Sequence, residues 1–320
     1  MASMASSTVL HGKKQSAQQS ALLLGLVVLG IILRAVLSPS LAIPAASLHS
    51  LILLLAALVF FGAASSVSLK KHVSGFVRGI LPWFVSVVLI SIPFYFATGK
   101  STPAALVAAV IITAVAHAHD AAPAVSIFAV LVALLMPLGL PALLLKVVAS
   151  LGVALFVCLL TFRFMRAVHS HLWSPLAVVA ALLLTFVLAH QLGGSGLFAV
   201  TAFGVLFGTV SLKEKTAVAL FMGHFTNAAS LVVFLLAGFL IPLPFTLSFA
   251  VLCLALFAGV LVLRYVAFLF VPHAGHALAS TVAPPRAAAL ALLLLAPVPS
   301  VLVLVLLFNA LFLVYRPKPI

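Results

Sequence analysis

Asp120 and Glu214 are the only two side-chain carboxylates in a chain of 320 residues that carries 16 lysines and arginines. Asp120 follows His117 and His119 at the junction of two apolar stretches, whereas Glu214 stands between two lysines. An ionisable group inside or beside hydrocarbon is costly to keep there, and such groups mark ion or proton pathways. Asp120 is therefore the first candidate for binding a cation or a proton, and Glu214 is expected to be a solvated loop charge.

The histidines beside Asp120 titrate near neutral pH, so His117 and His119 are candidates for relaying protons. A metal site would need all three side chains to converge, but helical spacing spreads them over more than half of the circumference. No cysteine or second carboxylate lies nearby, so we predict no metal site. Two simpler interpretations stay open: interfacial histidines, and Asp120 as the N-cap of a helix that starts near Pro123.

The sequence does not show the residue arrangements that are typical of enzyme active sites. No nucleophile elbow is present. The run Gly193-Gly194-Ser195-Gly196 follows no soluble strand and lacks the lysine of a phosphate-binding loop, so it indicates close helix packing. We predict that the protein is not an enzyme and needs no cofactor.

The elements that position these residues lie in a bilayer. Hydrophobic residues make up 66% of the chain, the mean hydropathy is +1.44 and charged residues are only 6%, against about a quarter in soluble domains. The net charge of +14 does not indicate a nucleic-acid partner, because the basic residues sit in short loops between apolar spans. Cys158 and Cys253 fall inside apolar spans and are expected to be buried small hydrophobes.

We predict an all-α polytopic membrane bundle of about 12 spans, with residues 1–20 as a polar cytoplasmic arm and 21–320 as one transmembrane transporter domain. The expected helices are 21–37, 49–65, 79–98, 103–118, 122–137, 142–162, 174–190, 195–211, 216–241, 244–263, 285–296 and 299–315. The first of these also resembles a signal peptide, but an even number of spans needs it uncleaved.

Lysines and arginines gather in alternate loops, which sets the orientation. The loops and ends that carry them contain Lys13, Lys14, Lys70, Lys71, Arg78, Arg163, Arg166, Lys213, Lys215, Arg264, Arg286, Arg316 and Lys318. The intervening loops contain only Lys100. This asymmetry predicts a multi-pass protein of the cell membrane with both termini in the cytoplasm.

Two regions, 102–123 and 283–299, have short apolar segments beside prolines. They fall in two triplets of spans that run in opposite senses, the pattern of inverted repeats with broken helices around a transporter site. Arg286 opens a helix, which is the wrong end of the helix dipole for a cation unless it faces an anion such as Asp120. The alternatives are ordinary helix ends at the prolines and an arginine that anchors the topology.

Segment 193–208, GGSGLFAVTAFGVLFG, resembles the "GGSG-LAV-FG---G" helix of the monovalent cation:proton antiporter superfamily, specifically its sodium/proton exchangers. Segment 225–238, FTNAASLVVFLLAG, is similar to the family's "LTN--E-LVF-LLG" helix. Weaker similarities are those of 285–289 to a "PRG-AAA" helix start and of 51–71 to an "LLLF-AGLELDL" segment.

The resemblance implies a secondary transporter that exchanges a monovalent cation, with sodium as first choice, for protons by alternating access, and that pairs as a homodimer. The ion site would comprise Asp120, His119, Thr226, Asn227 and Arg286. The neutral oxygens of Thr226 and Asn227 suit a hard cation, although ordinary hydrogen bonds between helices would also use them.

The departures from the family pattern support a second interpretation. The family has Thr-Asp-Pro on its broken fourth helix and Asn-Asp on the next, whereas this shorter chain offers Asp120 alone for either motif. The acidic position of the later helix falls on Ser230. The alternative function is therefore a transport-inactive or partner-dependent membrane protein derived from the same scaffold.

Overall fold

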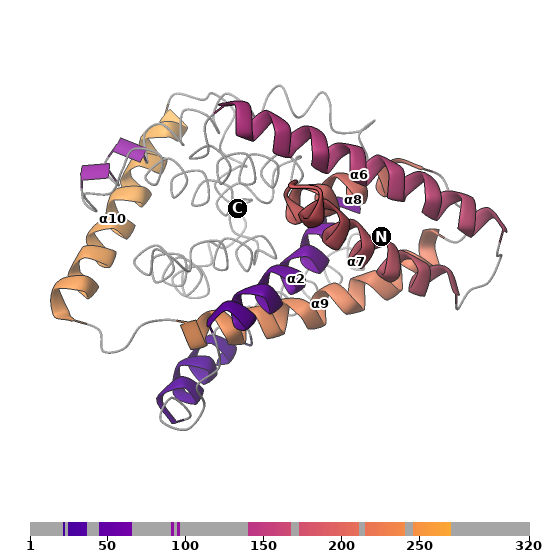
Figure 1. Ribbon diagram of the computed structural model, residues 1–320. Helices are drawn as coiled ribbons and strands as arrows, with labels where there is room; N and C mark the ends of the chain where they lie inside the picture. The colour runs from indigo at the N-terminus through magenta and orange to yellow at the C-terminus, as the bar shows by residue number, and fades with distance from the viewer. Residues whose placement is uncertain are drawn as a thin grey trace, which may run out of the picture.

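A computed structural model describes residues 22, 25–36, 45–65, 91–92, 95–96, 140–167, 173–210, 215–240 and 246–269. These residues form helices and a tight turn at 192–195, and no strand occurs among them (Figure 1). In chain order the labelled helices are α2 (Ala45–Ser65), α6 (Leu140–Ala167), α7 (Trp173–Gln191), α8 (Gly196–Thr209), α9 (Lys215–Leu240) and α10 (Leu247–Leu269). A further short helix covers Gly25–Val36. The predicted all-α class is confirmed for this part of the chain.

Three stretches of the described helices are long and apolar enough to cross a membrane: Pro141–Ala167, Ser174–Gln191 and Val218–Leu236. A straight crossing needs roughly 20 apolar residues. The composition and these helices together make the chain a membrane protein. The count of 12 spans and the inverted repeats depend also on segments outside the described residues.

Two helices end later than the sequence predicted. Helix α6 continues to Ala167, so Arg163 and Arg166 lie in its last turns and not in a loop. Helix α10 continues to Leu269 and includes Arg264. The predicted spans stopped at the first charge, but arginine is a strong helix former whose aliphatic stem can lie along apolar surface. A helix therefore need not end where the hydrocarbon ends.

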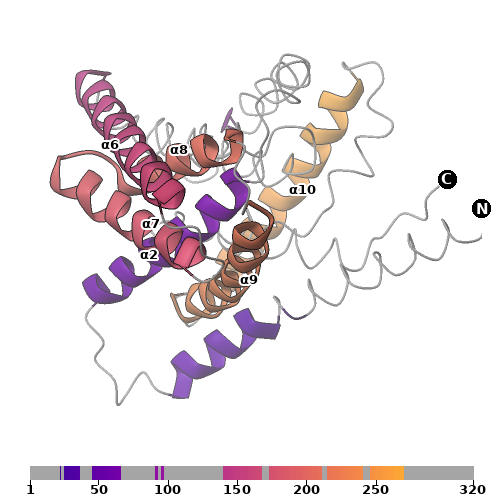
Figure 2. The same ribbon diagram turned by 90° about the vertical axis from the view of Figure 1, so that its right-hand side faces the viewer.

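Helix α8 forms the centre of the described bundle, where α2, α6 and α7 pack around it (Figures 1 and 2). It has 14 residues, of which 12 are buried. Its apolar side chains point in every direction because protein covers every side of it, so it shows no amphipathic stripe. Helix α10 lies apart from this group at the left of Figure 1.

Aromatic rings and a small residue join α8 to α2. The ring of Phe61 lies 5.2 Å from that of Phe203 and 5.8 Å from that of Phe207, measured between centroids, within the range of favourable ring pairs. Gly204 lets the two backbones approach, because a Cβ there would come within 3.0 Å of the Phe61 carbonyl oxygen. Phe61 and Phe203 are fully buried.

The helix Gly25–Val36 crosses α9 near its C-terminal end. A side chain at Gly238 would overlap backbone atoms of Val27, so the two backbones are in direct contact. Beside this crossing, the guanidinium of Arg34 donates a hydrogen bond of 3.2 Å to the carbonyl oxygen of Phe239. That carbonyl belongs to the last turn of α9, where helix carbonyls lack helical partners and a cation is favourable.

Candidate functional site

The glycine-rich run before α8 is a tight turn held by a side chain from α6. Gly193 has φ of 75°, a conformation that glycine adopts without strain. The amide of Ser195 donates to Ser150 Oγ at 2.8 Å, and Ser150 Oγ donates to the carbonyl of Lys146 at 2.6 Å. Ser195 in turn caps α8 by accepting from the amide of Phe198. The predicted role of this run in close helix packing is confirmed.

One buried hydroxyl in the described helices differs from the other buried threonines. Thr161, Thr185 and Thr201 each donate to the carbonyl oxygen four residues earlier, at 2.7, 2.7 and 2.8 Å. Thr226, which is 1% exposed, has no hydrogen-bond partner for Oγ1 among the described residues. An unpaired buried hydroxyl costs about 1–3 kcal/mol, so this oxygen is the clearest candidate for binding something that arrives during function.

The hydroxyl of Thr226 points across the interface between α9 and α2. It lies against Gly62, where an added Cβ would overlap the Thr226 side chain. On the α2 side, the hydroxyl of Ser65 donates to the carbonyl of Gly62 at 3.1 Å. A buried hydroxyl of α9 therefore lies where α9 and α2 approach each other closely.

Ser230 adds a second buried hydroxyl one turn further along α9. Its hydroxyl donates to the carbonyl oxygen of Thr226 at 2.6 Å, and its side chain is 6% exposed. Its proton is therefore already bound within the helix, and the Thr226 hydroxyl remains the atom without a partner.

Asn227 lies on a different face of α9 from Thr226. Consecutive residues of a helix are rotated by about 100°, and Asn227 is exposed whereas Thr226 is buried. The structure thus places these two predicted ligands side by side in sequence but does not direct them to one point. Asn227 shares its exposed face with His224, three residues earlier.

The other predicted site residues, Asp120, His119 and Arg286, lie outside the described residues, as do both proline-rich segments. Within the described part no group of three or more histidine, cysteine or acidic side chains could hold a metal. Cys158 and Cys253 are both buried, as predicted.

Sequence reasoning missed three residues of this arrangement: Gly62, Ser65 and Ser150. Their contacts join positions far apart in the chain, such as 150 and 195, and no local pattern reports such pairs. One available signal was Gly62 in an otherwise bulky apolar run, since an isolated glycine in a helix often marks a close approach.

No model of a known protein family matches the chain, and no curated protein matches it. The fold, in contrast, is similar to that of the sodium proton antiporter MjNhaP1 from Methanocaldococcus jannaschii. This similarity has a TM-score of 0.65 and covers 91% of this chain and 89% of that chain, at 14% sequence identity. The chain therefore has a fold found in a solved transporter.

Proposed function

We propose that a membrane chain with this fold exchanges a monovalent cation, sodium in the first place, for protons. One observation carries the proposal: the fold is similar, over nine-tenths of the chain, to that of a protein described as a sodium proton antiporter. The sequence segments that resemble exchangers, 193–208 and 225–238, form α8 and most of the second half of α9. Both the resemblance and the fold therefore support the same class of transporter.

In this proposal Asp120 binds the cation and the proton alternately, and Arg286 offsets its charge. The basis is scarcity, because Glu214 is the only other side-chain carboxylate and stands between two lysines. His119 is proposed to pass protons to Asp120. The 12 spans, the inverted repeats around the proline-rich segments, cytoplasmic termini, a cell-membrane location and pairing as a homodimer belong to the same proposal.

Thr226 is proposed to supply a neutral oxygen to the cation or to a water molecule that travels with it. Hard monovalent cations prefer oxygen ligands, and the Thr226 hydroxyl is buried without a hydrogen-bond partner among the described residues. Asn227 would serve from the exposed face of α9, at a different stage of the cycle from Thr226.

The test is proton flux in proteoliposomes that contain the purified chain, driven by gradients of sodium, potassium or lithium. Wild type should move protons against at least one of these cations. Asp120→Asn keeps the shape of the side chain but removes the charge and the proton, so it should abolish flux while the protein stays folded. Raising the cation concentration should shift the pH dependence of wild-type flux to lower pH, because cation and proton compete for one site.

A second function is supported by a specific observation. Ser230 occupies the position where the family pattern has an acid, and its hydroxyl is bound to the Thr226 carbonyl. A scaffold without that acid fits a transport-inactive or partner-dependent membrane protein. Folded wild type that shows no flux with any of the three cations would replace the exchanger by this alternative.

A further inference from the structure

The outer face of α6 carries a continuous apolar stripe. Its members recur at helical spacing and are exposed; they are Leu144, Leu145, Val148, Leu151, Leu155, Phe156, Leu159 and Leu160. The opposite face, which includes Val153, Ala154 and Val157, is buried against the bundle. In a membrane protein such an exposed stripe is the surface that meets lipid chains.

Helix α6 is longer than the hydrocarbon core that this stripe meets. Its 28 residues span about 42 Å, against about 30 Å of hydrocarbon. The stripe from Leu144 to Leu160 covers about 24 Å of that length. The last two turns therefore extend to the depth of the lipid headgroups, and they contain Arg163, Phe164 and Arg166.

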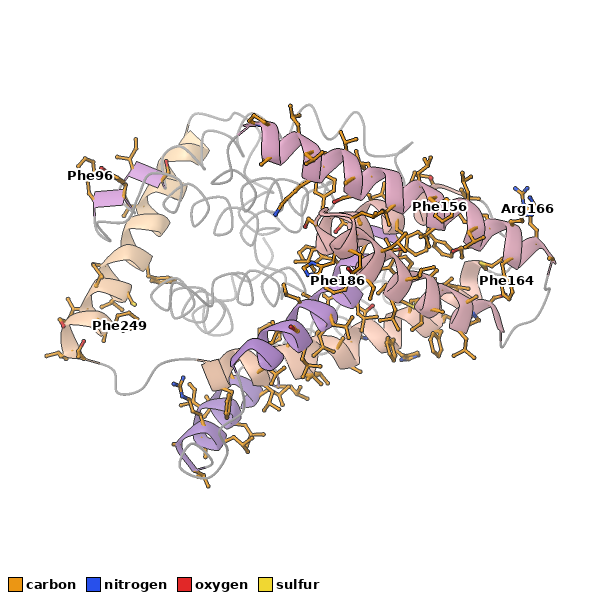
Figure 3. The ribbon with its side chains drawn as sticks, viewed as in Figure 1. Phe96, Phe156, Phe164, Arg166, Phe186 and Phe249 are labelled. Atoms are coloured by element: carbon orange, nitrogen blue, oxygen red, sulfur yellow. The ribbon has the colours of Figure 1, made fainter. Side chains whose placement is uncertain are left out.

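The two arginines continue the line of the stripe. Arg163 follows Leu159 by four residues and precedes Arg166 by three, so the two arginines lie on the same side of the helix. Both are exposed, and Figure 3 shows Arg166 at the end of α6, directed away from the bundle. Phe164, which lies between them in the sequence, is 47% exposed and adds apolar surface in the same turn of the helix.

No carboxylate in the described part of the chain can neutralise this pair. The two acids of the whole chain, Asp120 and Glu214, lie outside the described residues. The chain has 16 lysines and arginines against these two acids. Two like charges three residues apart repel each other unless an anion lies between them. At headgroup depth in a bilayer, net negative charge is supplied by anionic phospholipids, which bear it on phosphate groups.

We propose that the C-terminal end of α6 binds an anionic phospholipid. Arg163 and Arg166 would donate to the phosphate oxygens, in the forked geometry that suits arginine, while an acyl chain lies along Leu155 and Leu159. An arginine that only sets topology can stand anywhere in a short loop. A lipid site, in contrast, needs both charges in line with the apolar stripe, which is where they are.

The test measures lipid contact near the two arginines through the fluorescence of a tryptophan introduced at position 164. The chain carries Phe164→Trp together with Trp83→Phe and Trp173→Phe, so that its fluorescence reports one position. It is reconstituted in bilayers that contain either brominated phosphatidylglycerol or brominated phosphatidylcholine, and quenching gives the relative association of the two lipids. Each arginine should contribute about fivefold to the preference for the anionic lipid.

Changing both Arg163 and Arg166 to Gln should bring the preference close to one. The matched control is Lys146→Gln, which removes one positive charge from the same helix about 25 Å away and should leave the preference unchanged. Equal quenching by both lipids in the parent chain would overturn the proposal. An effect of Lys146→Gln equal to that of the double change would also overturn it, since any charge would then suffice.

A measurement on the parent chain alone covers the case in which the double variant does not fold. The preference should fall as salt rises, because exposed charges are screened, and a preference insensitive to salt would contradict the arginine site. Millimolar inorganic phosphate should not reduce quenching, because free phosphate lacks the acyl contact; displacement by phosphate would overturn the lipid assignment. This readout needs no transport, so its failure and that of the proposed exchange are separate results.

Discussion

The hydroxyl of Thr226 has no hydrogen-bond partner among the described residues, so removing it should not destabilise the protein. Thr226→Val keeps the shape of the side chain and removes an unpaired buried hydroxyl. It should leave the free energy of unfolding unchanged or raise it by about 1 kcal/mol. If the hydroxyl binds the transported cation, the same variant should raise the KM of proton flux for that cation.

The matched control is Thr201→Val. Thr201 is equally buried, but its hydroxyl donates to a carbonyl at 2.8 Å, so the change should cost about 1 kcal/mol. Thermal unfolding of both variants in detergent gives the comparison. Equal losses for Thr226→Val and Thr201→Val would mean that Thr226 has a partner in the working protein even without a cation.

Ser150 leads to a prediction at the turn before α8. Ser150→Ala leaves the part-buried amide of Ser195 without its acceptor, which should lower the free energy of unfolding by about 1 kcal/mol. Ser248, whose hydroxyl bonds are on the surface, is the control, and Ser248→Ala should stay within about 0.5 kcal/mol of wild type. A loss from Ser248→Ala as large as that from Ser150→Ala would contradict this ranking.

At this scale the sequence identified residue types and not the directions in which their side chains point. Thr226 and Asn227 were both recognised as neutral oxygen donors, yet one is buried and the other exposed. Their directions follow from the packing of α9 on α2, which brings together residues more than 150 positions apart. No local pattern in a helix that is apolar all round reports which face is covered.

Among the elements, the helices themselves were predicted closely, but the ends of some of them were not. The predicted stretches 174–190 and 216–241 match α7 (Trp173–Gln191) and α9 (Lys215–Leu240) within one residue at each end. Helix α6 runs five residues beyond its predicted end. Long apolar runs fix where a helix must be, but the bilayer fixes only the buried part of its length.

The contacts of two glycines give a prediction about how elements pack. Gly62→Ala should destabilise the protein by about 1–3 kcal/mol, because the new methyl group overlaps the side chain of Thr226. Thr226→Ala in the same chain should recover much of that loss, since it removes the atoms that clash. A double-mutant cycle measured by thermal unfolding gives the interaction energy.

Gly238→Ala is the contrasting case. Its added methyl group meets backbone atoms of Val27, and no truncation of a side chain can move them. Thr226→Ala should therefore not rescue Gly238→Ala. Rescue of both glycine variants by Thr226→Ala would show a general relaxation of the bundle and contradict a specific contact at Gly62.

For the whole molecule, the prediction to test is the number of times that the chain crosses the bilayer. The proposed 12 spans place the residues before and after α8 on opposite sides of the membrane. Gly194 is a poor position for labelling because it is buried beside Ser150, whereas Gln191 is exposed. Cysteines introduced at Gln191 and at Lys213 should react with an impermeant maleimide from opposite sides.

The chain provides its own background control for this labelling. Cys158 and Cys253 are buried, so the protein without introduced cysteines should react little. Reaction of both introduced cysteines from the same side would break the proposed alternation of spans. The fold similarity itself was not available from local sequence patterns, because at 14% identity it rests on the arrangement of helices and on few shared residues.

The burial of α8 also has a consequence for how the protein is made. At 14 residues it is about 21 Å long, too short to span the hydrocarbon unaided. Helices α2, α6 and α7, which pack around it, all precede it in the chain. The ribosome therefore synthesises these three helices before α8, so they are available to receive it when it emerges.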